Sequence, residues 1–380
     1  MEIVFGAEGW RGVTADAVTI PNVRVVSQAL ADDLLERQAE EQGVVIGYDT
    51  RFLSEAFARE CAQVLAGNGV SVYLLDTVVP TPLLSFAVRY HGAAVGVMVS
   101  GGTRPPEWNG LAWKGPHAGP IMISELKYLA AKVGRSSPRS RSLESAMQQE
   151  LLRYANCDEP YVHHLLRLTS VSARKKRRLR LVVDAMHGSG GHLLTQALEE
   201  FGSEVIPMRM RHDPLFGGCV PDPAIAEQLM PLQEKVKDSG ADLGLALSGD
   251  GARLAAVDET GRVLTGQELF GLTALHLMRE RGWRGSLVKT SDVGKRIVDA
   301  LGKRFDQRVR EVGKGFKNVQ DRVQREDVLL AGDGDGNLLI PRHMPERDGL
   351  FVGLLLLEHL LWTEQSLAEA VDEMNGIVEK

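Results

Sequence analysis

The sequence has few cysteines and few aromatic residues, and it lacks both a basic excess and a long uninterrupted apolar segment. Its three cysteines, Cys61, Cys157 and Cys219, have no CxxC spacing, which excludes a disulfide framework or a zinc knuckle and predicts a reducing, cytoplasmic location. The formal net charge is −6, from 44 Lys plus Arg against 50 Asp plus Glu. Nucleic acid and anionic membranes are therefore not expected as partners, because both require a basic surface.

No segment has the pattern of a signal peptide or of a membrane span. The N-terminal residues Met1 to Gly6 include neither a basic region nor a long apolar one. The longest apolar run, Gly349 to Leu361, contains Glu358 and His359 and is too short to cross a bilayer. We predict that this run forms a buried helix.

Short apolar runs that end in Gly and Asp alternate with helical patterns along the chain. The strand-like runs are Val44 to Gly47, Ala94 to Val99, Leu179 to Val183, Leu243 to Leu247 and Val328 to Ala331. The helical patterns include Ser54 to Ala66, Leu193 to Phe201, Gly266 to Arg281 and Leu350 to Trp362. This alternation predicts an α/β fold with mixed, mostly parallel sheets that are buried on both faces. Ligands of such sheets bind beyond the carboxyl ends of the strands, so the Gly/Asp loops are the expected site.

The length of 380 residues predicts two or three domains, and no short repeat is present. The polar, turn-rich segment Gly134 to Ser145 places one boundary near residue 150, and the turn Val257 to Gly261 places a second. We therefore predict consecutive α/β domains at residues 1–150, 151–257 and 258–380. The basic run Arg174 to Arg178 precedes a strand and is interpreted as its solvated lead-in, with contact to a phosphate or an acidic partner as the alternative.

A glycine-rich turn near the N-terminus, Phe5 to Gly12, contains Arg11 and is suited to holding an anion close to the backbone. Five other motifs follow it in order: Gly47 to Arg51, Pro80-Thr81-Pro82, Pro105 to Gly110, Val183 to Gly188 and Pro345 to Gly349. Together, from residue 3 to about residue 362, they resemble the α-D-phosphohexomutase superfamily, which includes phosphoglucomutases, phosphomannomutases and phosphoglucosamine mutases.

The resemblance implies a cytoplasmic enzyme of four domains around one cleft. A phosphoserine in the first domain exchanges its phosphoryl group with a hexose phosphate, and a Mg²⁺ held by three aspartates of the second domain supports it. A loop of the third domain selects the sugar, and a fourth domain clamps the distal phosphate. Domains I to III are expected here. After the helix that ends near Trp362 only a short amphipathic helix, Ser366 to Asn375, is expected, so the C-terminal domain IV is expected to be absent.

Aligned backwards from Gly110, the serine of the family falls on Gly102, which has no oxygen to phosphorylate. The hydroxyl groups of Ser100 and Thr103 are the possible substitutes, although a shift near 1 Å can cost about a hundredfold in rate. Arg11 and Lys114 occupy positions that face phosphoryl or proton-transfer chemistry in active relatives. From the resemblance alone, no catalytic residue is expected.

The aspartate-rich metal loop of the family is reduced here to Ser248-Gly249-Asp250-Gly251-Ala252-Arg253. Ser248 and Asp250 are the remnant of the metal site. One carboxylate and one hydroxyl are expected to be too few to hold Mg²⁺ tightly, so no cofactor is expected unless the chain is active.

The candidate substrate-binding residues come from the second and third domains. Lys314 lies in a segment that resembles the approach to the sugar-specificity loop, and Asp333 and Asp335 occupy the altered loop Gly332 to Asn337. Arg253 and Lys289 are the other two candidates, because they keep a positive charge at positions that face phosphoryl or proton-transfer chemistry in active relatives.

These losses predict a non-catalytic homologue, a pseudoenzyme with a regulatory, scaffolding or partner-binding role. The alternatives are a phosphosugar-binding sensor and an enzyme with reworked intramolecular phosphotransferase activity on hexose phosphates. The expected partners are a phosphosugar and either a second copy of the chain or another protein, such as an active mutase paralogue. The sequence does not select the hexose or the pathway.

Overall fold

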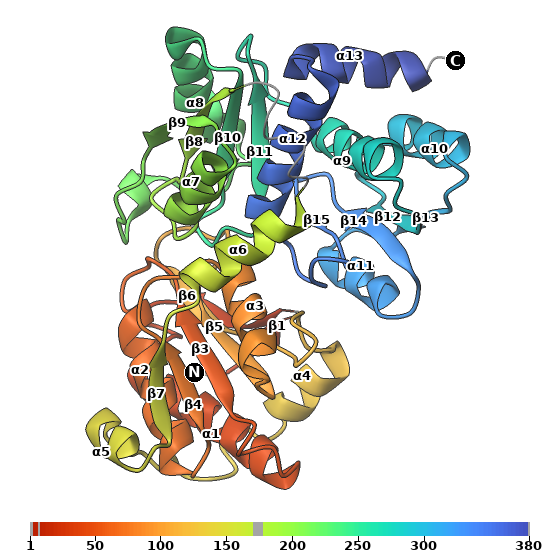
Figure 1. Cartoon of the computed structure of the whole chain (residues 1–380). Helices are drawn as coiled ribbons and strands as arrows, with labels where there is room; N and C mark the ends of the chain where they lie inside the picture. The colour runs from red at the N-terminus through yellow and green to blue at the C-terminus, as the bar shows by residue number, and fades with distance from the viewer. Residues whose placement is uncertain (1–2, 7, 170–177, 379–380) are drawn as a thin grey trace. The chain divides into compact units, whose positions relative to one another are not determined.

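A computed structural model of the chain describes residues 3–6, 8–169 and 178–378 (Figure 1). Residues 174–177 of the basic run Arg174 to Arg178 lie outside the described residues. The chain forms two compact units, Met1–Tyr161 with Asp213–Val220, and Val162–His212 with Pro221–Lys380. Within these units the described strands form three sheets.

The first unit contains a seven-stranded sheet with the order β1-β2-β6-β5-β3-β4-β7 among the described residues. The strands are β1 (Phe5–Gly6), β2 (Gly9–Val13), β3 (Val44–Tyr48), β4 (Val72–Leu75), β5 (Val95–Val99), β6 (Trp108–Lys114) and β7 (Leu152–Ala155). Strands β5, β3, β4 and β7 are parallel, whereas β6, β2 and β1 add antiparallel pairs at one edge. Strands β3 and β5 therefore end at the same edge of the sheet.

Helices cover both faces of this sheet. They are α1 (Ile20–Glu36), α2 (Ser54–Gly67), α3 (Thr81–His91), α4 (Ile123–Ala130) and α5 (Leu143–Gln148). Ile46 of β3 shares a buried core with Val23 of α1 and Phe57 of α2. The neighbouring Gly47 faces the other way, because a Cβ there would lie 3.2 Å from Leu84 of α3. Both faces of β3 are thus buried, which explains its continuous apolar sequence.

The second unit contains two four-stranded sheets among its described residues, with the orders β11-β10-β8-β9 and β13-β12-β14-β15. The strands of one are β8 (Arg180–Asp184), β9 (Glu204–Met208), β10 (Leu243–Leu247) and β11 (Leu254–Asp258). Those of the other are β12 (Ser286–Thr290), β13 (Val309–Val312), β14 (Val328–Gly332) and β15 (Leu338–Leu339). In each sheet one antiparallel pair lies at an edge and the other pairs are parallel.

The chain passes from the first unit to the second within helix α6 (Asp158–Leu168). The remaining helices are α7 (Gly191–Glu200), α8 (Ala226–Ser239), α9 (Gly266–Leu275), α10 (Lys295–Arg304), α11 (Phe316–Val323), α12 (Gly349–Thr363) and α13 (Leu367–Val378). A short 3-10 turn, Phe216–Gly218, precedes α8, and a π-helical turn, His276–Glu280, continues α9.

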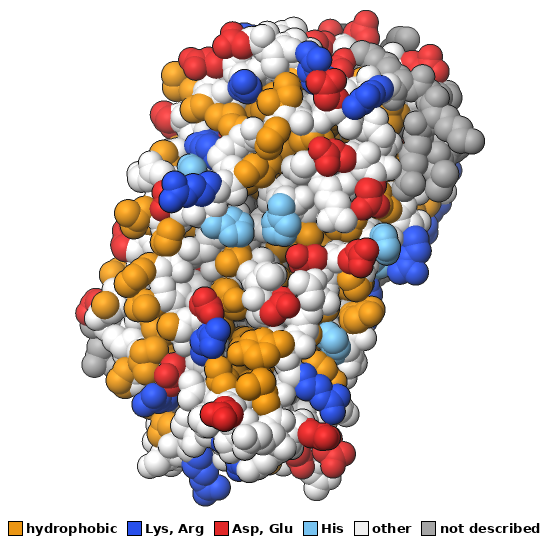
Figure 2. Space-filling view, turned by 60° about the vertical axis from the view of Figure 1, so that its left-hand side comes forward, with side chains coloured by type: hydrophobic (Ala, Val, Ile, Leu, Met, Phe, Trp, Pro, Cys, Tyr) orange, Lys and Arg blue, Asp and Glu red, His pale blue; other side chains and the backbone are white. Residues whose placement is uncertain are grey.

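The predicted α/β fold with mixed, mostly parallel sheets is confirmed. The run Gly349 to Leu361 is a fully buried part of α12, whose first turn is capped by Asp348. None of the described helices is long and apolar enough to span a membrane. On the face drawn in Figure 2, acidic and basic side chains are interspersed, as the small net charge predicts.

Candidate active site

The loop that follows β5 carries a buried hydroxyl group in contact with a carboxylate. Ser100 donates a hydrogen bond from its Oγ to Asp49 Oδ2 at 2.6 Å, and it accepts one from the Gly102 backbone N–H at 2.8 Å. Asp49 follows β3, so the two residues meet because β3 and β5 are parallel neighbours. A hydroxyl paired with a potential base is the arrangement of an activated nucleophile.

Arg51 holds this loop in place. Its guanidinium is fully buried and pairs with Asp49 Oδ2 at 3.2 Å. It also donates to four backbone carbonyl oxygens at 2.6 to 2.9 Å, those of Gly102, Arg104, Pro105 and Trp108. In the sequence, the Gly47 to Arg51 motif indicated the family resemblance alone, and neither Asp49 nor Arg51 was predicted to lie in the site.

Arg11 lies directly against the glycine that occupies the serine position of the family. Gly102 has a φ of 64°, and a Cβ added there would lie 2.6 Å from Arg11 Nη1. Arg11 Nη1 donates to the Gly101 carbonyl at 3.3 Å, whereas its buried Nε has no hydrogen-bond partner among the described residues. Thr103, on the same loop, is partly exposed. The structure thus brings Arg11, Ser100, Gly102 and Thr103 together.

Lys114 does not join this group. In the register of β5 and β6, Lys114 pairs with Gly96, and Leu111 pairs with Val99. Because Ser100 directly follows Val99, Lys114 lies four residues away along the sheet, roughly 13 Å at 3.3 Å per residue. The placement of Lys114 beside the phosphoryl chemistry, which the resemblance implied, has no support in this geometry.

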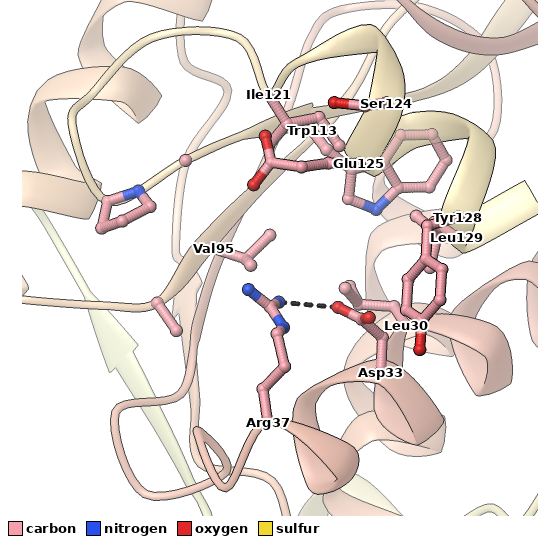
Figure 3. Close-up of a pocket in the computed structure, with 13 residues that line it drawn as sticks. Leu30, Asp33, Arg37, Val95, Trp113, Ile121, Ser124, Glu125, Tyr128 and Leu129 are labelled. Carbon is pink, nitrogen blue, oxygen red and sulfur yellow. Dashed lines mark ion pairs between the residues drawn. The ribbon is translucent and has the colours of Figure 1, made fainter.

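A pocket of about 310 Å³ opens at the opposite end of β5 (Figure 3). It is lined by Val95 and Trp113 and by Asp33 and Arg37 of the α1 region, which form an ion pair at 2.7 Å. Ligands of parallel sheets bind at the carboxyl ends of strands, and this pocket lies at the amino end of β5. The Ser100 loop is therefore the better candidate for chemistry.

In the second unit, the turn between β10 and β11 presents the remnant of the metal loop. Ser248 Oγ donates to Asp250 Oδ1 at 2.8 Å, and the Ala252 N–H donates to the same oxygen at 3.3 Å. Both side chains offer hard oxygen donors. In proteins Mg²⁺ keeps several waters and uses one or two carboxylates together with phosphate oxygens of a substrate. This donor set therefore fits a Mg²⁺ that also contacts a bound phosphate.

Arg253 connects the turn after β10 with the loop after β14. Its Nη1 pairs with Asp222 Oδ1 at 2.6 Å and its Nη2 lies 3.6 Å from Asp335 Oδ2. The Nε of Arg253 is buried and has no hydrogen-bond partner among the described residues. Asp335, the partner of Arg253, lines part of a pocket of about 210 Å³ together with Thr265.

Asp333 is engaged by its own loop. Its carboxylate accepts hydrogen bonds from the backbone N–H groups of Asp335 and Asn337 at 3.1 Å and from Asn337 Nδ2 at 2.8 Å. Burial raises the pKa of Asp333, although the charge of Arg253 and the Asn337 bonds act in the opposite direction. Asp333 therefore shapes the loop, and the side chain of Asp335, 59% exposed, is the one that faces outward.

The two candidate lysines of the third sheet have different surroundings. Lys289 is buried, and its Nζ donates to Glu311 Oε2 at 2.8 Å and to the Val293 carbonyl at 3.1 Å. Lys314 is exposed. Burial alone would raise the pKa of Asp292, but hydrogen bonds and the nearby charge of Lys314 hold it below its ordinary value. Of the two, Lys314 is the cation available to a ligand.

Family models match three consecutive parts of the chain. They are described as phosphoglucomutase/phosphomannomutase, alpha/beta/alpha domain I, domain II and domain III, and they match residues 2–139, 159–261 and 265–376. The order agrees with the predicted order of domains I to III.

Curated relatives align with nearly the whole chain. A phosphoglucomutase/phosphomannomutase of Thermococcus kodakarensis is 28% identical over 98% of this chain and 80% of its own length. A phosphoglucosamine mutase of Corynebacterium urealyticum is 29% identical over 98% and 82%. A crystal structure from Thermus thermophilus, which carries a provisional phosphomannomutase name, superposes with a TM-score of 0.92 at 32% identity, covering 100% of this chain and 84% of that one.

These relatives contradict the expectation of a non-catalytic pseudoenzyme. Proteins named as mutases align with 98% of the chain, so the similarity extends through the loops that were judged degenerate. The physical reason for the error lies in the loop after β5. The prediction combined the missing serine at Gly102 with the reduced metal loop and the missing fourth domain, and it gave little weight to Ser100, whose hydroxyl lies beside Asp49.

The expectation of no cofactor is corrected as well. A crystal structure of N-acetylphosphoglucosamine mutase of Aspergillus fumigatus holds GlcNAc-6P and magnesium, and it shares this fold with a TM-score of 0.61 at 14% identity over 97% of this chain and 79% of that one. Three aspartates were expected to be necessary, but a Mg²⁺ that keeps several waters and contacts phosphate oxygens needs only one or two protein carboxylates, so the loss of two aspartates does not exclude the metal.

Proposed function

Because the chain belongs to the phosphoglucomutase/phosphomannomutase family, we propose that it is an enzyme that moves a phosphoryl group between positions of a hexose phosphate. The observation that supports this most directly is the 2.6 Å hydrogen bond from Ser100 to Asp49 in the loop after β5. It gives the loop a hydroxyl acceptor and a base in contact with each other.

In this proposal Ser100 is the phosphoryl acceptor. Its Oγ forms a bond to the phosphorus of a sugar bisphosphate while the bond from phosphorus to the sugar oxygen breaks. Asp49 takes the hydroxyl proton, the leaving sugar oxygen takes up a proton from water, and a hexose monophosphate is released. Arg11, whose buried Nε has no partner among the described residues, neutralises the phosphoryl oxygens. Arg51 positions the loop through its four carbonyl contacts.

The substrate contacts are proposed in the second unit. Arg253 supplies a guanidinium beside a pocket of about 210 Å³, and Asp335 offers an exposed carboxylate to sugar hydroxyls. Lys314 adds an exposed cation near Asp292. Asp250 and Ser248 would hold Mg²⁺, which when bound neutralises the charge of a phosphate group.

The test is incubation of the full chain with glucose 1,6-bisphosphate and Mg²⁺, followed by intact-mass measurement and a coupled assay for interconversion of hexose 1- and 6-phosphates. We expect one phosphoryl adduct and turnover, both lost in Ser100→Ala and retained in the matched variant Thr103→Ala. Loss in Thr103→Ala alone would reassign the acceptor. Absence of adduct and of turnover with glucose, mannose and glucosamine phosphates would contradict the proposed enzyme.

A second candidate function is a phosphosugar sensor. It is favoured by one observation: Ser100 is only 1% exposed, so a substrate reaches its oxygen only if the loop moves. Calorimetric titration with hexose phosphates separates the two functions. Heat of binding together with turnover supports the enzyme, and heat of binding without turnover supports the sensor.

We carry three further expectations over from the sequence as proposals: division of the chain at residues 150 and 257, a cytoplasmic location, and assembly as a homodimer or with another protein. Limited proteolysis, cell fractionation and light scattering of the purified chain test them in turn.

A further inference from the structure

His276, Glu280 and His359 form a buried cluster in the second unit, away from the loops described above. His276 and Glu280 lie on the π-helical turn that continues α9, and His359 lies on α12. Both histidines are 1% exposed. One ligand atom from each of the three residues lies within 4.8 Å of the other two.

Five polar atoms of this cluster have no hydrogen-bond partners among the described residues. They are both ring nitrogens of His276, both ring nitrogens of His359 and Oε2 of Glu280. Buried polar atoms in folded proteins are almost always paired with protein groups or ordered water. Unpaired atoms on three residues at one place therefore point to an ion that takes one ligand atom from each residue.

The distances fit a metal ion better than direct hydrogen bonds. Glu280 Oε2 lies 3.6 Å from His276 Nδ1 and 3.7 Å from His359 Nδ1. These separations exceed those of good hydrogen bonds. Ligand atoms of a tetrahedral zinc ion, with bonds of about 2.0 to 2.1 Å, are roughly 3.3 Å apart. We propose that His276, Glu280 and His359 bind a zinc ion, with water in the fourth position.

A hydrogen bond orients one of the three ligands, and a carboxylate lies near a second. Glu280 accepts a hydrogen bond from Arg279 Nε on its Oε1 at 2.5 Å, which leaves Oε2 for the metal. His276 Nε2 lies 3.7 Å from Glu358 Oε2, and Glu358 also pairs with Arg281. A carboxylate behind a metal-binding histidine is a common means of fixing the ring and raising its basicity.

The backbone agrees with this assignment. The π-helical turn is closed by a bond from the Arg281 N–H to the His276 carbonyl at 3.2 Å, and such turns occur often at functional sites.

The test uses the full chain. Elemental analysis after dialysis against micromolar zinc should give about one zinc per chain, removable by a chelator. Cobalt added to the chelated protein should give the intense visible absorption of a tetrahedral N/O site, a result that needs no variant. The variants His276→Gln and His359→Gln should each lose the zinc, and the matched variant His163→Gln, at an exposed position of α6, should keep it.

Two results would overturn the proposal. One is a wild-type protein that retains no zinc and shows no tetrahedral cobalt spectrum. The other is zinc retained equally by folded His276→Gln and His359→Gln proteins, which would place the metal elsewhere. Neither result bears on the hydrogen bond between Ser100 and Asp49, because these residues belong to the other compact unit.

Discussion

Ser100 and Asp49 are joined by a 2.6 Å hydrogen bond between side chains that are only 1% and 2% exposed. A hydrogen bond to an ionised carboxylate in a buried setting is short and strong, and it directs the hydroxyl hydrogen towards the base. The residues follow different strands, β3 and β5, so the sheet itself sets their distance.

Replacing the base should therefore remove most phosphoryl transfer. In Asp49→Asn we expect the rate of adduct formation to fall by about 10² to 10⁴-fold, the usual contribution of a positioned general base. The rate is measured by intact mass at timed intervals. Asp16→Asn, at an exposed position, serves as the control and should match wild type. An unchanged rate in folded Asp49→Asn would show that Asp49 has a structural role alone.

A second prediction concerns the close approach of Arg11 to Gly102. Gly102 and Gly92 have nearly the same φ, 64° and 65°, but a Cβ at Gly92 would meet nothing within 4 Å. Gly92→Ala should cost about 1 to 2 kcal/mol of unfolding free energy through backbone strain. Gly102→Ala should cost more and should also weaken phosphosugar binding, because Arg11 must move. Denaturant titration and calorimetry measure the two effects, and equal behaviour of the two variants would disprove the prediction.

The magnesium requirement should depend on Asp250. In Asp250→Asn we expect the Mg²⁺ concentration for half-maximal turnover to rise at least about tenfold, since one of two hard protein donors loses its charge. Asp238→Asn, at an exposed position of α8, is the control. If Asp250→Asn responds to Mg²⁺ as wild type does, the metal is bound elsewhere.

The turn after β11 should contribute stability that depends on pH. The buried Asp258 carboxylate accepts hydrogen bonds from Thr260 Oγ1 at 2.6 Å and from Arg262 Nε at 2.9 Å. Burial alone would raise the pKa of Asp258, but these bonds hold it below its ordinary value of 3.8. The stabilisation is fully present above that value and is lost as the pH falls through the lower pKa of the folded state.

Asp258→Asn should accordingly lower the unfolding free energy by about 1.5 to 3 kcal/mol at pH 7, the range for hydrogen bonds to a charged group. Denaturant titrations at pH 7, 5 and 3 compare the variant with wild type. The difference should shrink only at the acid end. A difference that is constant over this range would show that the charge is unimportant.

The three cysteines should differ in reactivity. Burial raises the pKa of the Cys61 thiol to about 12 and that of Cys157 to about 11, so neither provides thiolate at neutral pH. Cys219 is partly exposed. Titration of the native protein with a disulfide reagent should show one fast thiol, absent in Cys219→Ser. A fast thiol that persists in that variant would contradict the assignment.

Sequence patterns identified the strands because the central strands are buried on both faces. The runs Val44 to Gly47 and Val328 to Ala331 differ from β3 and β14 by one residue at one end. The helix expected from Gly266 to Arg281 changes to a π-helical turn at His276, a change that apolar spacing does not encode. The position of Lys114 opposite Gly96 was not predictable, because a motif gives the order of residues but not the register of β6 on β5.

Site chemistry was harder to predict where it depends on distant residues. The Ser100 to Asp49 bond requires that β3 and β5 be neighbours, which the sequence suggests only through the fold class. His276 and Glu280 are four residues apart, a spacing that could have indicated one face of a helix. The third residue, His359, lies within the leucine-rich run of α12, and it comes close to His276 and Glu280 only because α12 packs against their turn.

The contacts of Arg51 have an evolutionary consequence for the loop after β5. Arg51 holds the loop by donating hydrogen bonds to backbone carbonyl oxygens, which every amino acid possesses. The Cζ atom of Arg51 lies over the ring of Phe216, 5.0 Å from the ring centroid. Substitutions at Thr103 and Arg104 can therefore change the side chains of the loop while the path of the backbone persists. This part of the loop can vary in sequence without loss of the fold.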